Sequence, residues 1–283
     1  MNDLNHNNRQ LTGQAPGMWE TWSRGQILAL AILLMAGNFF FQIVFYLIRQ
    51  DLFLPVLAGA LGGVLVPMVL MARRWDLSFS RDFGLTFPHP AVLGAAALIS
   101  ICSVMPTSLL AEFSIRLHPV DPEWMTLYLE NLPNTTWEII LAAVTVVLVA
   151  PVAEEIIFRG LLQRVTATLW GPLPGILVSA LLFGIVHGEP WFLFGLIGVG
   201  LVLAFIFATT GSVTACWVAH GLHNAVSLWV MLGGGEGPNE PRPVTAQDWA
   251  LAAVSVVGLV VVGKFLLANG KVVYRASGQG TVN

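Results

Sequence analysis

Residues 137–162 read WEIILAAVTVVLVAPVAEEIIFRGLL, and this stretch decides the fold class of the protein. Its first two thirds are apolar almost without interruption. A helix needs about 20 such residues to cross the ~30 Å hydrocarbon core of a bilayer. The same stretch then carries Glu154, Glu155 and Arg159, which are costly at membrane depth and for that reason indicate a functional site.

The rest of the chain shares this apolar character. Of its 283 residues 56% are hydrophobic and only 10% are charged, whereas a soluble domain carries roughly 25% charged residues. Because helices satisfy their own backbone in lipid, this composition predicts an all-α, polytopic membrane protein with about eight transmembrane helices around an intramembrane cavity. The expected spans are 26–48, 52–72, 90–114, 137–162, 173–188, 191–209, 212–232 and 249–269.

Charge sets the expected orientation and excludes one class of partner. With both termini in the cytoplasm, ten of the 13 Lys and Arg residues lie inside and three outside, so the positive-inside rule predicts N-in and C-in. The membrane is then the plasma (inner) membrane if the source is bacterial. The net charge is −3 and no basic run occurs, which argues against nucleic acid.

Two segments outside the spans have their own expected character. The polar residues 1–24 form a cytoplasmic tail without the apolar core of a cleaved signal peptide. Residues 119–136 are expected to hold a short interfacial helix with Trp124 and Tyr128 at headgroup level.

The first candidate motif is the charged cluster of the fourth span. Glu155 and Arg159 are spaced i, i+4 with the acid first, the favourable order for a helical ion pair. Glu154 projects about 100° away, so one carboxylate is neutralised locally while its neighbour faces a cavity. The alternative is one structural charge cluster near the inner interface.

Two further motifs contain histidine. His187 follows Phe183 at i+4, and His220 and Asn224 share one helix face at i, i+4. Interhelical hydrogen bonding is an alternative for the latter pair. If Gly171 and its neighbouring prolines turn the chain, the two arms of the hairpin are each roughly 22 Å long and return His187 to the level of Glu154. A map of the spans, however, puts His187 near the outer end of its helix and the glutamates near the inner face.

Hydrolysis by an activated water is the reaction that this set of residues suits. A buried glutamate and a histidine are suitable proton acceptors, and an Asn amide and a His N–H are suitable donors to an oxyanion. The sequence contains neither Gly-x-Ser-x-Gly nor His-Glu-x-x-His. Water is therefore the expected nucleophile.

These motifs resemble those of a known family. Glu154-Glu155-x-x-x-Arg159, Phe183-x-x-x-His187 and His220-x-x-x-Asn224 are similar to the three signatures of the CPBP intramembrane proteases (CAAX proteases, or Abi), which include the Ras-converting CAAX endopeptidase. The resemblance implies that Glu154 and His187 activate the water, that His220 and Asn224 stabilise the oxyanion, and that Glu155 with Arg159 holds the site in shape.

The resemblance also implies a division of the chain. After the tail 1–24, residues 25–130 form N-terminal transmembrane helices, residues 131–235 the catalytic helices, and residues 236–283 the last span and a C-terminal tail. The expected partners are the lipid bilayer and a protein or peptide substrate in or at the membrane.

The sequence leaves alternatives open for the cofactor and for the function. The family has been described both as metalloproteases and as glutamate-dependent enzymes; we favour no cofactor, with zinc bound by His187, His220 and a glutamate as the alternative. A non-proteolytic scaffold or immunity protein of the same fold is the second functional hypothesis. A proton-coupled transporter, with the glutamates and histidines as a relay, is the third.

Overall fold

The computed structural model describes residues 17–233 and 243–270. Within these residues the chain is all-helical, which confirms the predicted fold class. Most of the polar N-terminal tail, the C-terminal tail from residue 271 and the loop 234–242 lie outside the described residues.

Helices occupy all eight predicted stretches, in places as several consecutive elements of one continuous rod. A short helix, α2, and a second short helix, α7, lie outside these stretches. The bounds are α2 Met18–Thr21, α3 Arg24–Arg49, α4 Phe53–Ala58, η1 Gly59–Leu65, α5 Val66–Trp75, α6 Pro90–Leu117, α7 Pro122–Glu130, α8 Thr136–Ala143, η2 Val144–Val149, α9 Ala150–Glu155, η3 Ile156–Gln163, α10 Arg164–Trp170, α11 Pro172–Val186, η4 Pro190–Phe192, α12 Leu193–Thr210, α13 Val213–Leu232 and α14 Ala246–Asn269.

The predicted number of membrane spans is not confirmed. Among the described residues six helical segments are long and apolar enough to cross a membrane: Arg24–Arg49, Phe53–Trp75, Pro90–Leu117, Thr136–Trp170, Pro190–Thr210 and Ala246–Asn269. Helix α11 is apolar but has only 15 residues. Helix α13 has 20 residues, but two histidines and an asparagine lower its hydropathy.

Local sequence signals explain where several helices begin. Capping boxes, in which a Ser or Thr side chain and the residue three positions later satisfy each other's backbone N–H groups, start α3, α8 and α14. Gly211, in the left-handed region at φ 66°, ends α12 and allows the tight turn into α13.

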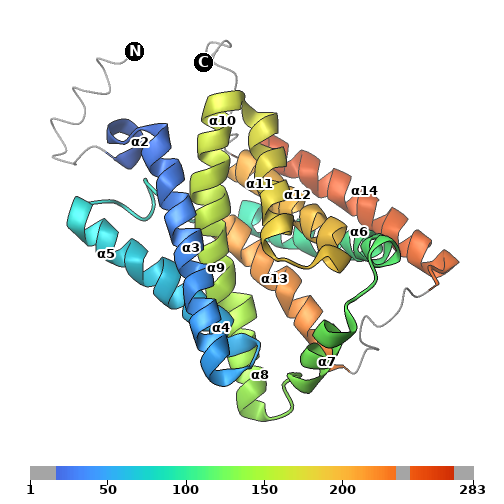
Figure 1. The fold of residues 1–283 in the computed structure, drawn as a ribbon. Helices are drawn as coiled ribbons and strands as arrows, with labels where there is room; N and C mark the ends of the chain where they lie inside the picture. The colour runs from blue at the N-terminus through green and yellow to red at the C-terminus, as the bar shows by residue number, and fades with distance from the viewer. Residues whose placement is uncertain (1–16, 234–242, 271–283) are drawn as a thin grey trace.

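The rod Thr136–Trp170 is central to the arrangement (Figure 1). Helix α3 and the η1 segment pack along one side of it, and the antiparallel pair α11 and α12 packs along another. Helix α13 crosses the rod near η2 and α9, and α6 packs against α12, α13 and α14. The rod therefore contacts both the N-terminal helices and the C-terminal half of the bundle.

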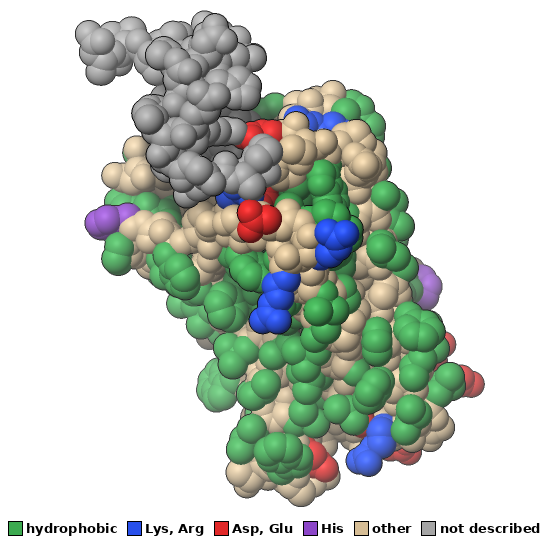
Figure 2. Space-filling view, turned by 90° about the vertical axis from the view of Figure 1, so that its left-hand side faces the viewer, with side chains coloured by type: hydrophobic (Ala, Val, Ile, Leu, Met, Phe, Trp, Pro, Cys, Tyr) green, Lys and Arg blue, Asp and Glu red, His purple; other side chains and the backbone are tan. Residues whose placement is uncertain are grey.

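The outer surface suits contact with lipid. Figure 2 shows hydrophobic side chains over much of one face, between charged side chains toward its two ends. Many large apolar residues are exposed, among them Val254, Val257 and Val261 on α14. Exposure of this apolar surface to water would be unfavourable. In a bilayer the lipid chains contact it directly, so no further protein is needed to bury it. The protein is an integral membrane protein.

The predicted helix between the third and fourth spans is present as α7. Trp124 stacks on Tyr128 with ring centroids 5.3 Å apart, and Trp124 also contacts Trp191 at 5.1 Å. Its position at the membrane interface stays a prediction.

Candidate active site

Pro151 shapes the rod just before the paired glutamates. Proline has no backbone N–H, and inside a helix its ring clashes with the carbonyl four residues earlier, which here belongs to Val147. The preceding turn, η2, has π-helical geometry, which is often found at functional sites. This local distortion presents backbone carbonyls of the rod to its neighbour α13.

Helix α13 docks onto these carbonyls through side-chain donors. The amide Nδ2 of Asn224 donates to the Val146 carbonyl at 2.8 Å, and Trp217 Nε1 donates to the Leu148 carbonyl at 2.8 Å. Gly221 lies between them, and a Cβ there would be only 2.4 Å from the Val147 carbonyl oxygen. Because only glycine fits this approach, the sequence of α13 sets how closely its two motif residues come to the glutamates.

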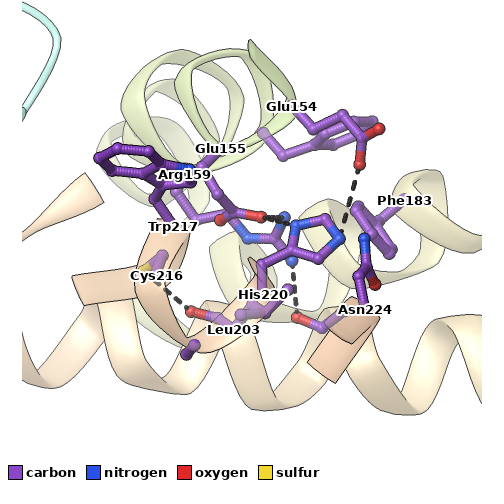
Figure 3. Close-up of polar contacts among 12 residues, drawn as sticks. Glu154, Glu155, Arg159, Phe183, Leu203, Cys216, Trp217, His220 and Asn224 are labelled. Atoms are coloured by element: carbon purple, nitrogen blue, oxygen red, sulfur yellow. Dashed lines mark hydrogen bonds and ion pairs between the residues drawn. The ribbon is translucent and has the colours of Figure 1, made fainter. Parts of the chain in front are cut away.

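Glu155, Arg159 and His220 form a buried polar cluster (Figure 3). Arg159 Nη1 donates to Glu155 Oε1 at 2.9 Å, and both side chains are fully buried. The same carboxylate oxygen lies 2.9 Å from His220 Nδ1, and Arg159 Nη2 donates to the Gly200 carbonyl at 3.0 Å. Glu155 is thus held by two cationic or N–H partners, which compensates the cost of burying its charge.

Glu154 lies on the opposite side of the His220 ring from Glu155 (Figure 3). Its Oε2 atom is 3.8 Å from His220 Nε2, and its side chain is 26% exposed. This distance is too long for a hydrogen bond. The paired glutamates therefore have different environments, one buried and bonded and the other facing open space, as the sequence predicted.

His187 lies at the C-terminal end of α11. Its Nδ1 donates to the Phe183 carbonyl at 2.6 Å, which leaves Nε2 as the nitrogen that accepts a proton in the neutral ring. The Phe183 ring packs between the two histidines, with centroids 4.7 Å from His187 and 5.5 Å from His220. Arg159 also lies 4.8 Å from the centre of this ring.

One cavity of about 510 Å³ unites the residues of the three motifs. Glu154, His187, His220 and Asn224 all line it. Glu155 and Arg159 do not line it but lie behind His220. The fold thus brings together the four residues predicted to face the reaction and puts the two predicted supporting residues behind them.

His187 and Glu154 line the same cavity, as the residue count along the hairpin predicted, and the position of the glutamates relative to the two membrane faces stays a prediction. Glu154 and Glu155 lie near the middle of the 35-residue rod Thr136–Trp170. The fourth helix continues past the predicted end at residue 162 to Trp170, next to the turn at Gly171. His187 at the end of the short α11 is consequently level with the glutamates and lines the same cavity.

Sequence reasoning missed several polar residues of the cavity wall. Asn38 and Gln42 of α3 line the cavity, as do Glu189 and His223. The signal for the first pair was present, since two amides at i, i+4 interrupt the apolar span 26–48. His223 was noted without a role; its Nδ1 is buried and has no hydrogen-bond partner among the described residues.

Glu189 gives a pH-dependent prediction. It is half-buried in the turn between α11 and η4, and burial raises the pKa of its carboxyl to about 7. This pKa lies above that of a glutamate in an unfolded chain, which is about 4.3. Protonation of the Glu189 carboxyl therefore stabilises the folded state relative to the unfolded one. That contribution is present below about pH 4 and is lost as the pH rises through 7.

We therefore expect Glu189→Gln to raise the melting temperature relative to wild type at pH 8 and to have a smaller effect at pH 5. Thermal unfolding in detergent at the two pH values measures this. If the melting temperatures of Glu189→Gln and wild type differ by the same amount at both pH values, the raised pKa of Glu189 is contradicted.

Comparison with known families supports the motif analysis. Residues 136–226 match the family model described as Rce1-like, a type II CAAX prenyl endopeptidase Rce1-like domain. The match supports assignment of the chain to the CPBP (CAAX-protease) family. The match spans the rod, α11, α12 and α13 as far as residue 226, and all six candidate residues lie inside it. No curated protein and no solved structure matches the chain.

Zinc, the alternative cofactor, has no ready set of three ligands among the described residues. A zinc site takes at least three protein ligands. Among residues 17–233 and 243–270, no group of three or more His, Cys, Asp or Glu side chains is arranged to hold a metal. The absence of a cofactor stays a prediction, which the chelator experiment below tests.

Proposed function

We propose that this CPBP-family protein is an intramembrane endopeptidase that hydrolyses peptide bonds of a membrane-associated protein or peptide. The observation that carries the proposal is the convergence of Glu154, His187, His220 and Asn224 on one cavity. Two proton acceptors and two hydrogen-bond donors around a space large enough for a peptide segment are the parts that water-mediated amide hydrolysis needs.

Glu154 and His187 are the proposed activators of water. Glu154 is ionisable, partly exposed and without a short hydrogen bond, so its carboxylate is free to accept a proton. His187 presents Nε2 because Nδ1–H donates to the Phe183 carbonyl. The water oxygen attacks the carbonyl carbon and forms the new C–O bond while its proton passes to one of these groups.

His220 and Asn224 are the proposed donors to the oxyanion. Asn224 has a second amide N–H besides the one that donates to Val146. His220 reaches the cavity through Nε2, since Nδ1 contacts Glu155. Nε2 donates to the oxyanion when it carries a proton, while Nδ1 keeps its contact with Glu155.

Collapse of the tetrahedral intermediate completes the reaction. The C–N bond breaks, and the proton accepted from water passes to the leaving nitrogen, so that the products are a carboxylic acid and an amine. Glu155 does not touch the substrate in this scheme. It positions His220 through Nδ1 and is itself neutralised by Arg159.

The cavity lies nearer one end of the bundle. Its lining comes from the second half of α3, the C-terminal end of α11 and the middle and second half of α13. All three run toward the lower end in Figure 1. Substrate therefore enters from that end, which faces away from the cytoplasm if the N-in orientation holds.

The test uses purified wild type and Glu154→Gln in detergent with a library of fluorogenic peptides, each with and without a strong chelator. We expect cleavage by wild type, none by Glu154→Gln, and no effect of the chelator. Loss of activity with the chelator and recovery with zinc would instead make the enzyme a metalloprotease. Absence of cleavage by wild type would contradict the proposal and favour a binding scaffold.

A further inference from the structure

We propose that Asn38 and Gln42 of α3 hold the backbone of an extended peptide in the cavity, so that the N-terminal helices supply the substrate-binding wall of the site. This inference rests on the proposed function. It assigns a role to a part of the chain that lies outside the region matched by the family model.

The position of the two amides carries the first step. Met35, Asn38, Phe39 and Gln42 follow the i, i+3, i+4, i+7 spacing of one helix face, and all four line the cavity that contains Glu154. A smaller hollow beside it is again lined by Asn38, Gln42 and Glu154. The amides and the proposed base therefore face a common space, although they lie more than 100 residues apart in the sequence.

The chemistry of the two amides carries the second step. Each offers two N–H donors and a carbonyl acceptor, and each lies in an otherwise apolar helix, where burying a polar group without a partner is costly. Within the described parts of the chain, no hydrogen bond joins either side chain to another residue. Their hydrogen-bonding capacity is thus available to a bound molecule.

The packing of η1 against α3 holds the side chains of Asn38 and Gln42 in place. A Cβ at Gly59 would lie 2.6 Å from Asn38 Oδ1 and 2.7 Å from Gln42 Cγ. Because Gly59 has no side chain, the η1 segment approaches α3 closely there and supports both amides from behind. Side chains held in this way lose less conformational entropy on binding than free ones.

The spacing of the amides fits an extended peptide. Four residues of an α-helix rise about 6 Å, and two residues of an extended chain rise about 6.6 Å. The backbone groups on one edge of such a peptide repeat every two residues, so one amide can bond each of two successive groups. A peptide at membrane depth needs this, since its backbone N–H and C=O groups have no other partners in lipid.

The experiment measures binding and hydrolysis of one probe, the peptide of the fluorogenic library that wild type cleaves fastest. Asn38→Leu and Gln42→Met keep size and remove hydrogen bonding. We expect each to raise KM, and to raise the Kd for the labelled peptide in a Glu154→Gln background, by about five- to tenfold, with kcat nearly unchanged. Asn269→Leu, at the exposed end of α14, is the matched control and is expected to leave KM unchanged.

A second series distinguishes binding from a structural role. Ester analogues of the peptide replace one backbone N–H at a time by oxygen. We expect two positions separated by one residue to weaken binding to wild type, and the same esters to have no further effect on the variant that lacks the corresponding amide. If a variant does not fold, the ester series with wild type is sufficient. Weaker binding at two positions separated by one residue supports the proposal, and any other pattern contradicts it.

The outcomes separate this inference from the proposed function. Cleavage by wild type with KM, Kd and ester sensitivity unchanged in both variants would overturn the inference and leave the protease intact. Absence of cleavage by wild type would overturn both.

Discussion

Replacing Glu155 with alanine is expected to lower the free energy of unfolding by about 3–5 kcal/mol and to abolish activity. Arg159 would then keep a fully buried positive charge whose carboxylate partner is gone. Its remaining hydrogen bond, from Nη2 to the Gly200 carbonyl, does not neutralise that charge. His220 would lose the contact at Nδ1 in the same change.

Folded yield and melting temperature in detergent measure the effect of Glu155→Ala. Glu154→Ala is the matched control, since this neighbouring carboxylate is partly exposed and has no ion pair with arginine, and we expect its melting temperature to stay near that of wild type. The double variant Glu155→Ala/Arg159→Met removes both charges and is expected to regain much of the lost stability. Wild-type yield and melting temperature for Glu155→Ala would show that the pair does not stabilise the fold.

Replacing His220 with alanine is expected to lower kcat by about 10²- to 10³-fold, the usual effect of removing one donor to an oxyanion. Asn224→Ala is expected to have an effect of similar size. The proposed donor atoms are His220 Nε2 and the second N–H of Asn224, because the other N–H groups already contact Glu155 and Val146.

Trp217→Phe distinguishes the two roles of Asn224, which are the hydrogen bond to the Val146 carbonyl and the proposed hydrogen bond to the oxyanion. Both residues donate from α13 to a carbonyl of η2, but Trp217 does not line the cavity. We expect Trp217→Phe and Asn224→Ala to lower the melting temperature to a similar extent and only Asn224→Ala to lower kcat. Wild-type kcat for either His220→Ala or Asn224→Ala would rule out that residue as an oxyanion donor.

Several features of the site were predictable because they depend on local spacing. The i, i+4 relation of Glu155 and Arg159 implies an ion pair in any helix, and the structure contains it. Counting residues along the two arms of the hairpin through Gly171 placed His187 level with Glu154, although the map of the spans placed it elsewhere. The roles assigned to the six candidate residues, and the division of the chain at residues 24, 130 and 235, stay predictions.

Other features were beyond sequence reasoning because they depend on how helices meet. The count of spans depends on the 15-residue α11 and on α13, whose polar residues lower its hydropathy. The end of the fourth helix was misjudged, since nothing in the local pattern showed that it continues from residue 162 to Trp170. The partner of His220 was equally hidden, because its contact with Glu155 joins residues 65 positions apart.

The sequence by itself predicted an all-helical membrane protein and the three motifs that resemble those of the CPBP family, since hydropathy, helical periodicity and motif spacing are properties of the chain alone. Only the tertiary structure decided that Glu155 is buried behind His220, that Glu154 faces the cavity, and that Asn38 and Gln42 form its far wall. The physical reason is that burial and hydrogen bonding are set by contacts between helices. In this protein those contacts depend on close approaches such as that of Gly221 to Val147.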